Sequence, residues 1–156
     1  MKKPETRNQR PEKAKIRMRF VCAALLVSGF WFLVSCRTVG ISMTKGGYAE
    51  VSPQIANEMI LDSRQIVILD VRSADMYRGP DGHIGGALSA PFETIERQLP
   101  ELLPYQNQTV LVYGEGDADG ALAAKLLIIA GFRNVVHVSG GLHGWIEHGY
   151  RTVNAQ

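Results

Sequence analysis

Residues Thr109–Gly120 read TVLVYGEGDADG, a short apolar run followed at once by a glycine-rich acidic loop. The five residues of Thr109–Tyr113 predict a strand that is buried on both faces, as in a parallel sheet. The Ala- and Leu-rich segment after the loop, Gly120–Ala130, predicts a helix that ends at Gly131. The stretch therefore predicts a strand, a loop and a helix in succession.

The same alternation continues on both sides of this stretch. Gln65–Asp70 (QIVILD) and Asn134–Val138 predict two further buried strands. The other predicted elements are a helix starting at Ser52-Pro53, a short helix capped by Ser73, an extended piece at Ala87–Ala90, one or two helices in Phe92–Leu103 broken at Pro100, and a last helix around Trp145. Strands that alternate with helices over short connections predict a single α/β domain, with a mostly parallel central sheet flanked by helices.

Four motifs occur in a fixed order along the chain. They are ILDVR (Ile68–Arg72), GHIGGALSAP (Gly82–Pro91), the strand and loop of Thr109–Gly120, and AGFRNVVHVSGGLHGW (Ala130–Trp145). In this order and spacing the chain resembles a rhodanese-like domain, which has the sulfurtransferase fold. The resemblance covers residues 48–152 and implies the same α/β architecture.

The resemblance also implies structural roles for four residues of these motifs. Asp70 and Arg72 are expected to make hydrogen bonds or an ion pair beside the active loop. His83 is expected to pack and hydrogen-bond within its Gly-rich turn, and Trp145 to cover the edge of the core with its indole.

The position directly after the TVLVY strand holds the nucleophile in rhodanese-like enzymes. There a cysteine sits in a loop whose N–H groups, together with the following helix N-terminus, stabilise the thiolate and the persulfide. Here the aligned residue is Gly114, and the chain has no cysteine after Cys36. The degenerate loop consists of Gly114, Glu115, Gly116, Asp117, Ala118, Asp119 and Gly120. The resemblance thus implies no catalytic residue, and the missing thiol argues equally against the related cysteine-dependent phosphatase chemistry.

The three carboxylates of the loop allow three interpretations. Asp117 or Asp119 caps the helix that is expected to begin near Gly120. Alternatively, the loop recognises a cationic or polar partner. The third interpretation is a calcium loop, but a bidentate glutamate would be needed at the position of Leu126, so the motif is incomplete.

The four histidines do not follow a metal-ligand spacing. His143 and His148 are five residues apart, which places them on different faces of a helix. We therefore expect no metal site and no cofactor. The leucines of the loop's helix, Leu122, Leu126 and Leu127, together with Ile128, are interpreted as core packing.

The first 36 residues have the character of an export signal. Residues 1–19 are basic and polar, and Phe20–Val34 is an uncharged apolar run, which is short for a membrane-spanning helix. Leu33-Val34-Ser35-Cys36 has the order of a bacterial lipobox, so residues 1–35 are predicted to be a lipoprotein signal peptide, starting at Met1 or Met18. Cys36 would carry the lipid (palmitate or a similar acyl chain) and residues 36–47 would form the tether. The alternative is an uncleaved signal anchor in which the cysteine is accidental.

Charge is divided unevenly between the signal and the rest of the chain. Of the 17 Lys and Arg residues, eight precede Cys36, and of the 15 Asp and Glu residues, only two do. The remaining chain is therefore acidic and would repel nucleic-acid phosphate, which disfavours a nucleic-acid partner.

These observations predict a rhodanese-like binding or scaffolding module without catalytic turnover. It would be lipid-anchored through Cys36 on the extracytoplasmic side of a bacterial cell-envelope membrane, with an unidentified protein partner. Two enzymatic alternatives stay open. One is a sulfurtransferase whose thiol comes from a partner chain, and the other is a metal-dependent activity of the acidic loop 115–119.

Overall fold

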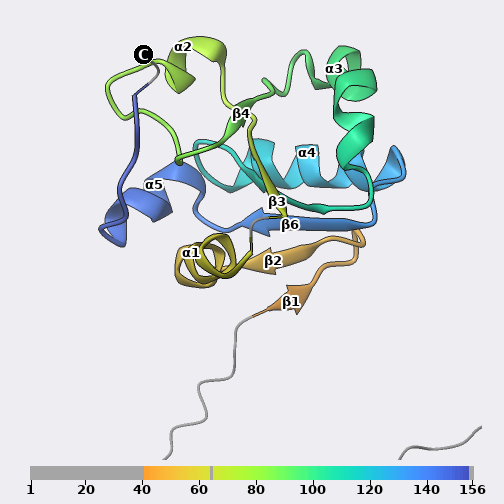
Figure 1. Cartoon of the computed structure of the whole chain (residues 1–156), viewed down its shortest axis with the longest axis horizontal. Coiled ribbons are helices and arrows are strands. Elements are labelled where there is room, and N and C mark those ends of the chain that lie inside the picture. The colour runs from red at the N-terminus through yellow and green to blue at the C-terminus, as the bar shows by residue number, and fades with distance from the viewer. Residues whose placement is uncertain (1–40, 64, 155–156) are drawn as a thin grey trace, which may run out of the picture. The chain divides into compact units, whose positions relative to one another are not determined.

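The computed structural model describes residues 41–63 and 65–154 (Figure 1). The predicted signal peptide and Cys36, the predicted site of lipidation, lie outside these residues. Over the part of the chain that is described, no helix combines the length and hydropathy that a membrane crossing needs.

Six strands form one sheet in the order β1-β2-β6-β5-β3-β4. The strands are β1 (Ser42–Met43), β2 (Ala49–Val51), β3 (Ile66–Asp70), β4 (Leu88–Ser89), β5 (Thr109–Tyr113) and β6 (Asn134–Val138). Only β1 is antiparallel to its neighbour, and the other five strands run in parallel. The carboxyl ends of these five strands therefore share one edge of the sheet.

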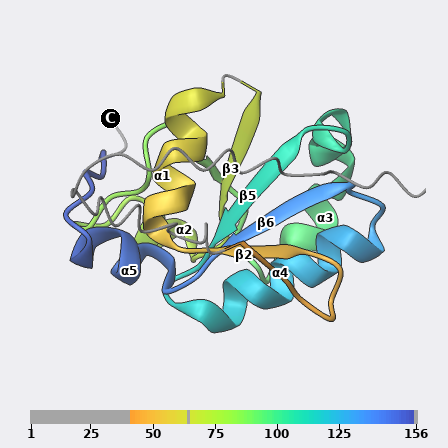
Figure 2. The same ribbon diagram turned by 90° about the horizontal axis from the view of Figure 1, so that it is seen from below.

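Helices cover both faces of the sheet (Figure 2). They are α1 (Pro53–Asp62), α2 (Ala74–Tyr77), α3 (Ile95–Leu102), the 3₁₀ turn η1 (Leu103–Tyr105), α4 (Asp117–Ile129) and α5 (Gly141–Glu147). Alternate strand residues face opposite layers, since Val110 and Val112 pack with α3 and α4, whereas Leu111 and Tyr113 pack with α1 and α5. The predicted single α/β domain with a mostly parallel, helix-flanked sheet is confirmed.

Most predicted elements occur where the residue pattern indicates them. The strands at Thr109–Tyr113 and Asn134–Val138 have the predicted bounds. Ser73 caps α2, because its hydroxyl accepts a hydrogen bond from the Met76 N–H at 3.3 Å. Ser52 is the N-cap residue of α1, although its side chain makes no capping bond.

Two helix predictions are wrong. Pro100 does not break α3, which continues to Leu102, because the apolar face containing Ile95 and Leu102 is buried and holds the helix in place. The second wrong prediction concerns α4, which begins at Asp117 rather than near Gly120.

Two further differences concern packing at the surface. Leu122 is 52% exposed, so it does not belong to the core, whereas Leu127 is fully buried. At the amino-terminal side, Ser42 and Met43 pair with β2. The sheet thus extends into residues 36–47, for which the sequence predicts a tether.

Candidate functional site

The segment after β5 lies at the carboxyl edge of the sheet, against the start of α5. Gly141 has a φ of +56°, and a Cβ atom there would lie 2.5–2.7 Å from three carbonyl oxygens, those of Gly114, Glu115 and Gly116. The N–H groups of Leu142 and His143 donate to the carbonyl oxygens of Gly114 and Glu115, respectively. The close approach of α5 therefore requires glycine at position 141 and fixes the path of the loop.

Gly114 is buried, and a side chain at this position would point toward the first turn of α4. A Cβ atom on Gly114 would lie 3.0 Å from the backbone nitrogen of Gly120 and 3.4 Å from the Cβ of Asp119. The position therefore faces N–H groups at the positive end of a 13-residue helix. The carbonyl oxygen of Gly116 would also lie 3.4 Å from this Cβ atom, so the position is tightly enclosed and glycine leaves it without a side chain.

The loop carboxylates make contacts that the sequence does not predict. Asp117 accepts a hydrogen bond of 2.6 Å from the Gly140 N–H. The N-cap residue of α4 is Gly116, which makes no side-chain cap, and Asp117 and Asp119 lie in the first turn. The prediction that one of these aspartates caps the helix is therefore wrong, although both stand where the helix dipole favours a negative charge.

Glu115 lies between the guanidinium of Arg72 and the imidazole of His143. Its Oε1 is 2.9 Å from Nε2 of His143, and its Oε2 is 3.7 Å from Nη1 of Arg72. The Oε2 atom is buried and has no hydrogen-bond partner among the described residues. The sequence gives no signal for the pairing with His143, because it depends on how α5 docks on the loop.

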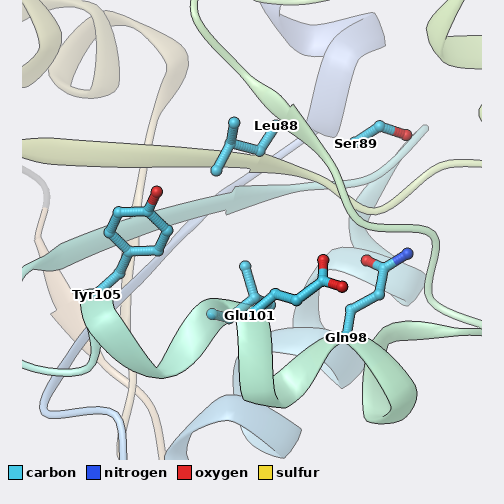
Figure 3. Close-up of a pocket in the computed structure, with 6 residues that line it drawn as sticks. Leu88, Ser89, Gln98, Glu101 and Tyr105 are labelled. Carbon is cyan, nitrogen blue, oxygen red and sulfur yellow. The ribbon is translucent and has the colours of Figure 1, made fainter.

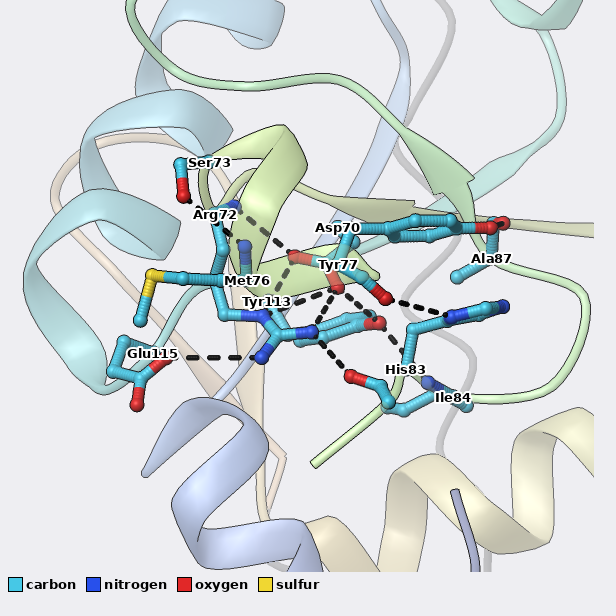
Figure 4. A network of polar contacts seen from close by, with 11 residues as sticks. Asp70, Arg72, Ser73, Met76, Tyr77, His83, Ile84, Ala87, Tyr113 and Glu115 are labelled. Atoms are coloured by element: carbon cyan, nitrogen blue, oxygen red, sulfur yellow. Dashed lines mark hydrogen bonds and ion pairs between the residues drawn. The ribbon is translucent and has the colours of Figure 1, made fainter. Parts of the chain in front are cut away.

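A buried polar network lies beneath the loop (Figure 4). Arg72 Nη2 is 2.6 Å from Asp70 Oδ2, and Arg72 Nε donates to Asp70 Oδ1 at 3.0 Å. The Tyr113 hydroxyl donates to Asp70 Oδ2 at 2.8 Å and accepts from the Ile84 N–H at 3.1 Å. A second bond of Arg72 Nη2, 2.7 Å long, reaches the Gly82 carbonyl. This network joins the ends of β3 and β5 to the turn that contains Gly82.

Burial and charge act together on the ionisation of this network. Burial alone lowers the pKa of Arg72, but the hydrogen bond and the charge of Asp70 outweigh it and raise that pKa above its usual value. Burial and the charge of Asp70 raise the pKa of Tyr113 far above its ordinary value. Asp70 thus faces a permanently charged guanidinium and a neutral phenol.

His83 and Trp145 are buried and hydrogen-bonded. The His83 ring stacks on Tyr77 with 3.8 Å between ring centroids, and its Nδ1 lies 3.2 Å from the Tyr77 carbonyl oxygen. The Trp145 indole N–H donates to the Arg151 carbonyl oxygen at 3.1 Å, and its ring packs against Tyr150.

One buried side chain near the loop escaped sequence analysis. His137, on β6, is 0% exposed, and its Nε2 has no hydrogen-bond partner among the described residues. A Cβ atom on Gly120 would lie only 2.7 Å from that Nε2. Gly120 thus lets α4 approach β6 over the imidazole. Local sequence does not reveal this contact, because the two residues are 17 positions apart.

Two hollows lie on the surface of the described part of the chain. One, of about 380 Å³, is lined by Asp81, His143, Ile146 and Glu147. The other, of about 340 Å³, lies beside the edge strand β4, where Leu88 and Ser89 face Glu101 and Tyr105 (Figure 3). Within residues 41–63 and 65–154, no three His, Cys, Asp or Glu side chains gather as a metal site would require.

Known families and structures share this architecture. The family model described as Rhodanese-like domain matches residues 52–148. The solution structure of a rhodanese-like domain from Anabaena is 31% identical, covers 68% of this chain and 79% of its own, and superposes with a TM-score of 0.60. A rhodanese-related protein from Thermoplasma volcanium is 25% identical, covers 67% of this chain and 96% of its own, and has a TM-score of 0.59.

Curated relatives resemble the chain over part of their length. The human centrosomal protein of 41 kDa is 28% identical over 65% of this chain and 28% of its own. The tRNA uridine(34) hydroxylase of Photorhabdus laumondii is 31% identical over 55% of this chain and 25% of its own. The match thus spans about a quarter of the length of these relatives.

Proposed function

Because the chain belongs to the rhodanese-like domain family, we propose that it is a membrane-anchored binding module of that family without sulfurtransferase turnover of its own. The observation that carries the proposal is Gly114 at the start of the loop after β5. The relatives' names range from a centrosomal protein to a tRNA hydroxylase, so the shared domain serves in different molecular settings.

The absence of turnover rests on chemistry that needs a thiolate. The missing side chain of Gly114 points at the first turn of α4, where backbone N–H groups would stabilise a sulfur anion. No cysteine follows Cys36 in the sequence, and residues 114–120 contain no serine, threonine or histidine. The domain therefore has no thiol that could accept a sulfur atom as a persulfide.

The charge of the loop supports a binding role for cationic partners. Asp119 is exposed, and Glu115 and Asp117 lie beside it within the same short segment. An anionic sulfur donor would be repelled here, whereas a basic segment of a partner protein would be attracted. The scaffold that usually orients a sulfur donor would in this way present carboxylates to another protein.

Membrane attachment through Cys36 is the second part of the proposal. The lipobox order of Leu33–Cys36 and the apolar run before it support lipidation of that cysteine. We expect the membrane-bound form to begin at Cys36 and Cys36→Ala to release the domain, with Cys22→Ala as a matched control that changes nothing. Retention of residues before Cys36 in the membrane fraction would contradict the anchor.

A thiosulfate:cyanide assay tests the absence of turnover. The full chain should produce thiocyanate no faster than a heat-denatured sample. Turnover well above that background would contradict the proposal. Turnover that appears only after a cysteine-bearing envelope protein is added would instead support the alternative in which the thiol comes from a partner.

A further inference from the structure

We propose that the end of the domain opposite the Gly114 loop lies on the membrane surface and turns the acidic loop toward the aqueous side. The inference rests on the proposed anchor at Cys36 and specifies how the anchored domain is oriented. The surface in question, here named the basal surface, consists of Met43, Lys45, Leu61, Ile129 and Arg133.

The basal surface contains large apolar side chains whose exposure to water is energetically unfavourable. Leu61 and Ile129 are each 77% exposed and Met43 is 72% exposed. These are the three highest values for large apolar residues in the described part of the chain. A single exposed leucine is ordinary, but three at one end of a small domain indicate a surface that is covered in the cell.

The parallel topology explains why the three residues share one end. Met43 pairs with Ala49, the first residue of β2. Leu61 lies in the last turn of α1, just before β3, and Ile129 ends α4, just before β6. Since the parallel strands all begin at this edge, these segments gather on the side away from the loops that follow the strands. Figure 2 shows α5 on the opposite side from the end of α4 and from the β1–β2 turn.

Contacts connect several of the segments that form the basal surface. A Cβ atom on Gly47, in the β1–β2 turn, would lie 3.5 Å from Cγ2 of Ile128 at the end of α4. The N–H of Arg133 donates to the Gln106 carbonyl oxygen at 3.1 Å, which ties the α4–β6 loop to the turn before β5. Met43 and Met59 also line a hollow of about 270 Å³ whose lining includes Arg133.

Charge favours an anionic lipid surface at this end. Lys45 and Arg133 are exposed on the basal surface, where Asp62 is the neighbouring acid. At the other end the carboxylates of Asp81, Glu115, Asp117, Asp119 and Glu147 outnumber the exposed cations Arg78 and Arg151. Anionic headgroups attract the first set and repel the second, so one orientation is favoured.

The length of the connecting chain keeps the domain close to its anchor. Only residues 37–40 separate Cys36 from Ile41, and five fully extended steps reach at most about 18 Å. A lipid on Cys36 would therefore hold β1 within that distance of the headgroups. A second copy docked through the same surface would place two surfaces that each carry Lys45 and Arg133 against each other, so a lipid surface fits the charges better.

Single introduced cysteines can test the orientation, because the sequence contains no cysteine after Cys36. The full chain, in a Cys22→Ser background, would carry Ile129→Cys or the control Asp75→Cys. Asp75 lies in α2, beyond the carboxyl end of β3, and its side chain is 98% exposed. Each cysteine is labelled with an environment-sensitive fluorophore, and the chain is reconstituted into vesicles of phosphatidylcholine and phosphatidylglycerol.

We expect iodide to quench the Ile129→Cys label about threefold less in vesicles than in detergent micelles, because the lipid shields it. The Asp75→Cys label should be quenched equally in both. Replacing Met43 and Leu61 with Gln should restore quenching at position 129. Equal quenching of both labels in vesicles overturns the proposal. Protection of the label at position 129 that persists in micelles and disappears when the protein is diluted also overturns it, because that result would indicate a second copy of the chain.

The Cys22→Ser chain without an introduced cysteine, here called the parent, shows whether a failure concerns the orientation of the domain or the lipid anchor. If the parent takes up label, Cys36 is free and the lipid anchor is contradicted. The two labels are then compared in a Cys36→Ser background with the same vesicles. Protection at position 129 alone supports the basal surface, and its absence overturns it.

Discussion

Arg72 binds the carboxylate of Asp70 through two nitrogens, Nε at 3.0 Å from Oδ1 and Nη2 at 2.6 Å from Oδ2, although only one residue separates them in sequence. Both side chains are almost wholly buried. The pair lies directly beneath Glu115, so the network supports the candidate loop as well as the junction of β3 and β5.

Asp70→Asn should strongly destabilise the domain. The substitution keeps the shape of the side chain but removes the closest counter-charge of a buried guanidinium, and breaking such a buried pair typically costs about 3–5 kcal/mol. Urea unfolding followed by circular dichroism measures the change. Asp75→Asn is the control, because the Asp75–Arg78 pair is exposed and 3.6 Å apart and should contribute almost nothing. Equal effects of the two substitutions would refute the importance assigned to the buried pair.

Alkaline pH should unfold the protein through Tyr113. Burial, followed by the charge of Asp70, raises the pKa of this phenol. The folded protein therefore keeps the phenolic proton, while the unfolded chain releases it near pH 10. The unfolded state then binds fewer protons than the folded state, so the free energy of unfolding falls as the pH rises above about 10.

Absorbance at 295 nm, combined with circular dichroism, tests this pH dependence. Of the five tyrosines, Tyr113 should ionise only as the ellipticity is lost. Tyr113→Phe should therefore reduce the increase in absorbance that accompanies unfolding. The same substitution should cost about 1–3 kcal/mol at neutral pH, because the buried Ile84 N–H loses its acceptor. Complete tyrosine ionisation before any loss of ellipticity would contradict the shift.

The sequence predicts the sheet better than the ends of its helices. Apolar runs such as Thr109–Tyr113 identify buried strands because both of their faces need apolar side chains. The start of α4 depends on Asp117, whose carboxylate is held by the N–H of Gly140, a residue 23 positions away. A capping rule that considers only neighbouring residues in the sequence cannot predict such a partner.

The same limit applies to the contacts of the candidate site. Local rules make Pro100 a helix breaker, yet the proline is exposed and buried neighbours hold α3 together. The motifs place Gly114 after β5, but they do not reveal that Glu115 meets His143. That pairing follows from the docking of α5, which only tertiary structure defines.

Gly141→Ala should be far more damaging than Gly149→Ala. Both glycines have positive φ values, +56° and +78°, so each substitution carries the cost of about 1 kcal/mol for placing a side chain in left-handed backbone. Only at Gly141 would the new Cβ meet three carbonyl oxygens within 2.7 Å, whereas at Gly149 nothing lies within 4 Å. The difference in unfolding free energy between the two variants isolates the contact of α5 with the loop. If both variants lose the same stability, that contact does not hold the loop.

Gly114→Cys should create a reactive thiol that is still a poor sulfur acceptor. The new side chain would point at the Gly120 N–H in the first turn of α4, which lowers the pKa of a thiol. The nearby carboxylates oppose this and repel thiosulfate. We therefore expect faster alkylation by iodoacetamide at neutral pH than for the control Ala118→Cys, whose position in the same segment is exposed.

Adding Asp119→Asn to Gly114→Cys tests whether charge limits that acceptor. Asp119 is exposed and its Cβ would be 3.4 Å from the new Cβ at position 114. Because one nearby negative charge is removed, the pH profile of alkylation should move to lower pH. The rate of sulfur transfer from thiosulfate should rise several-fold, and high salt should reduce the difference between the two variants. A Gly114→Cys thiol that alkylates no faster than the Ala118→Cys thiol would mean that the loop does not stabilise an anion. The charge of Asp119 would then be irrelevant to the proposed absence of turnover.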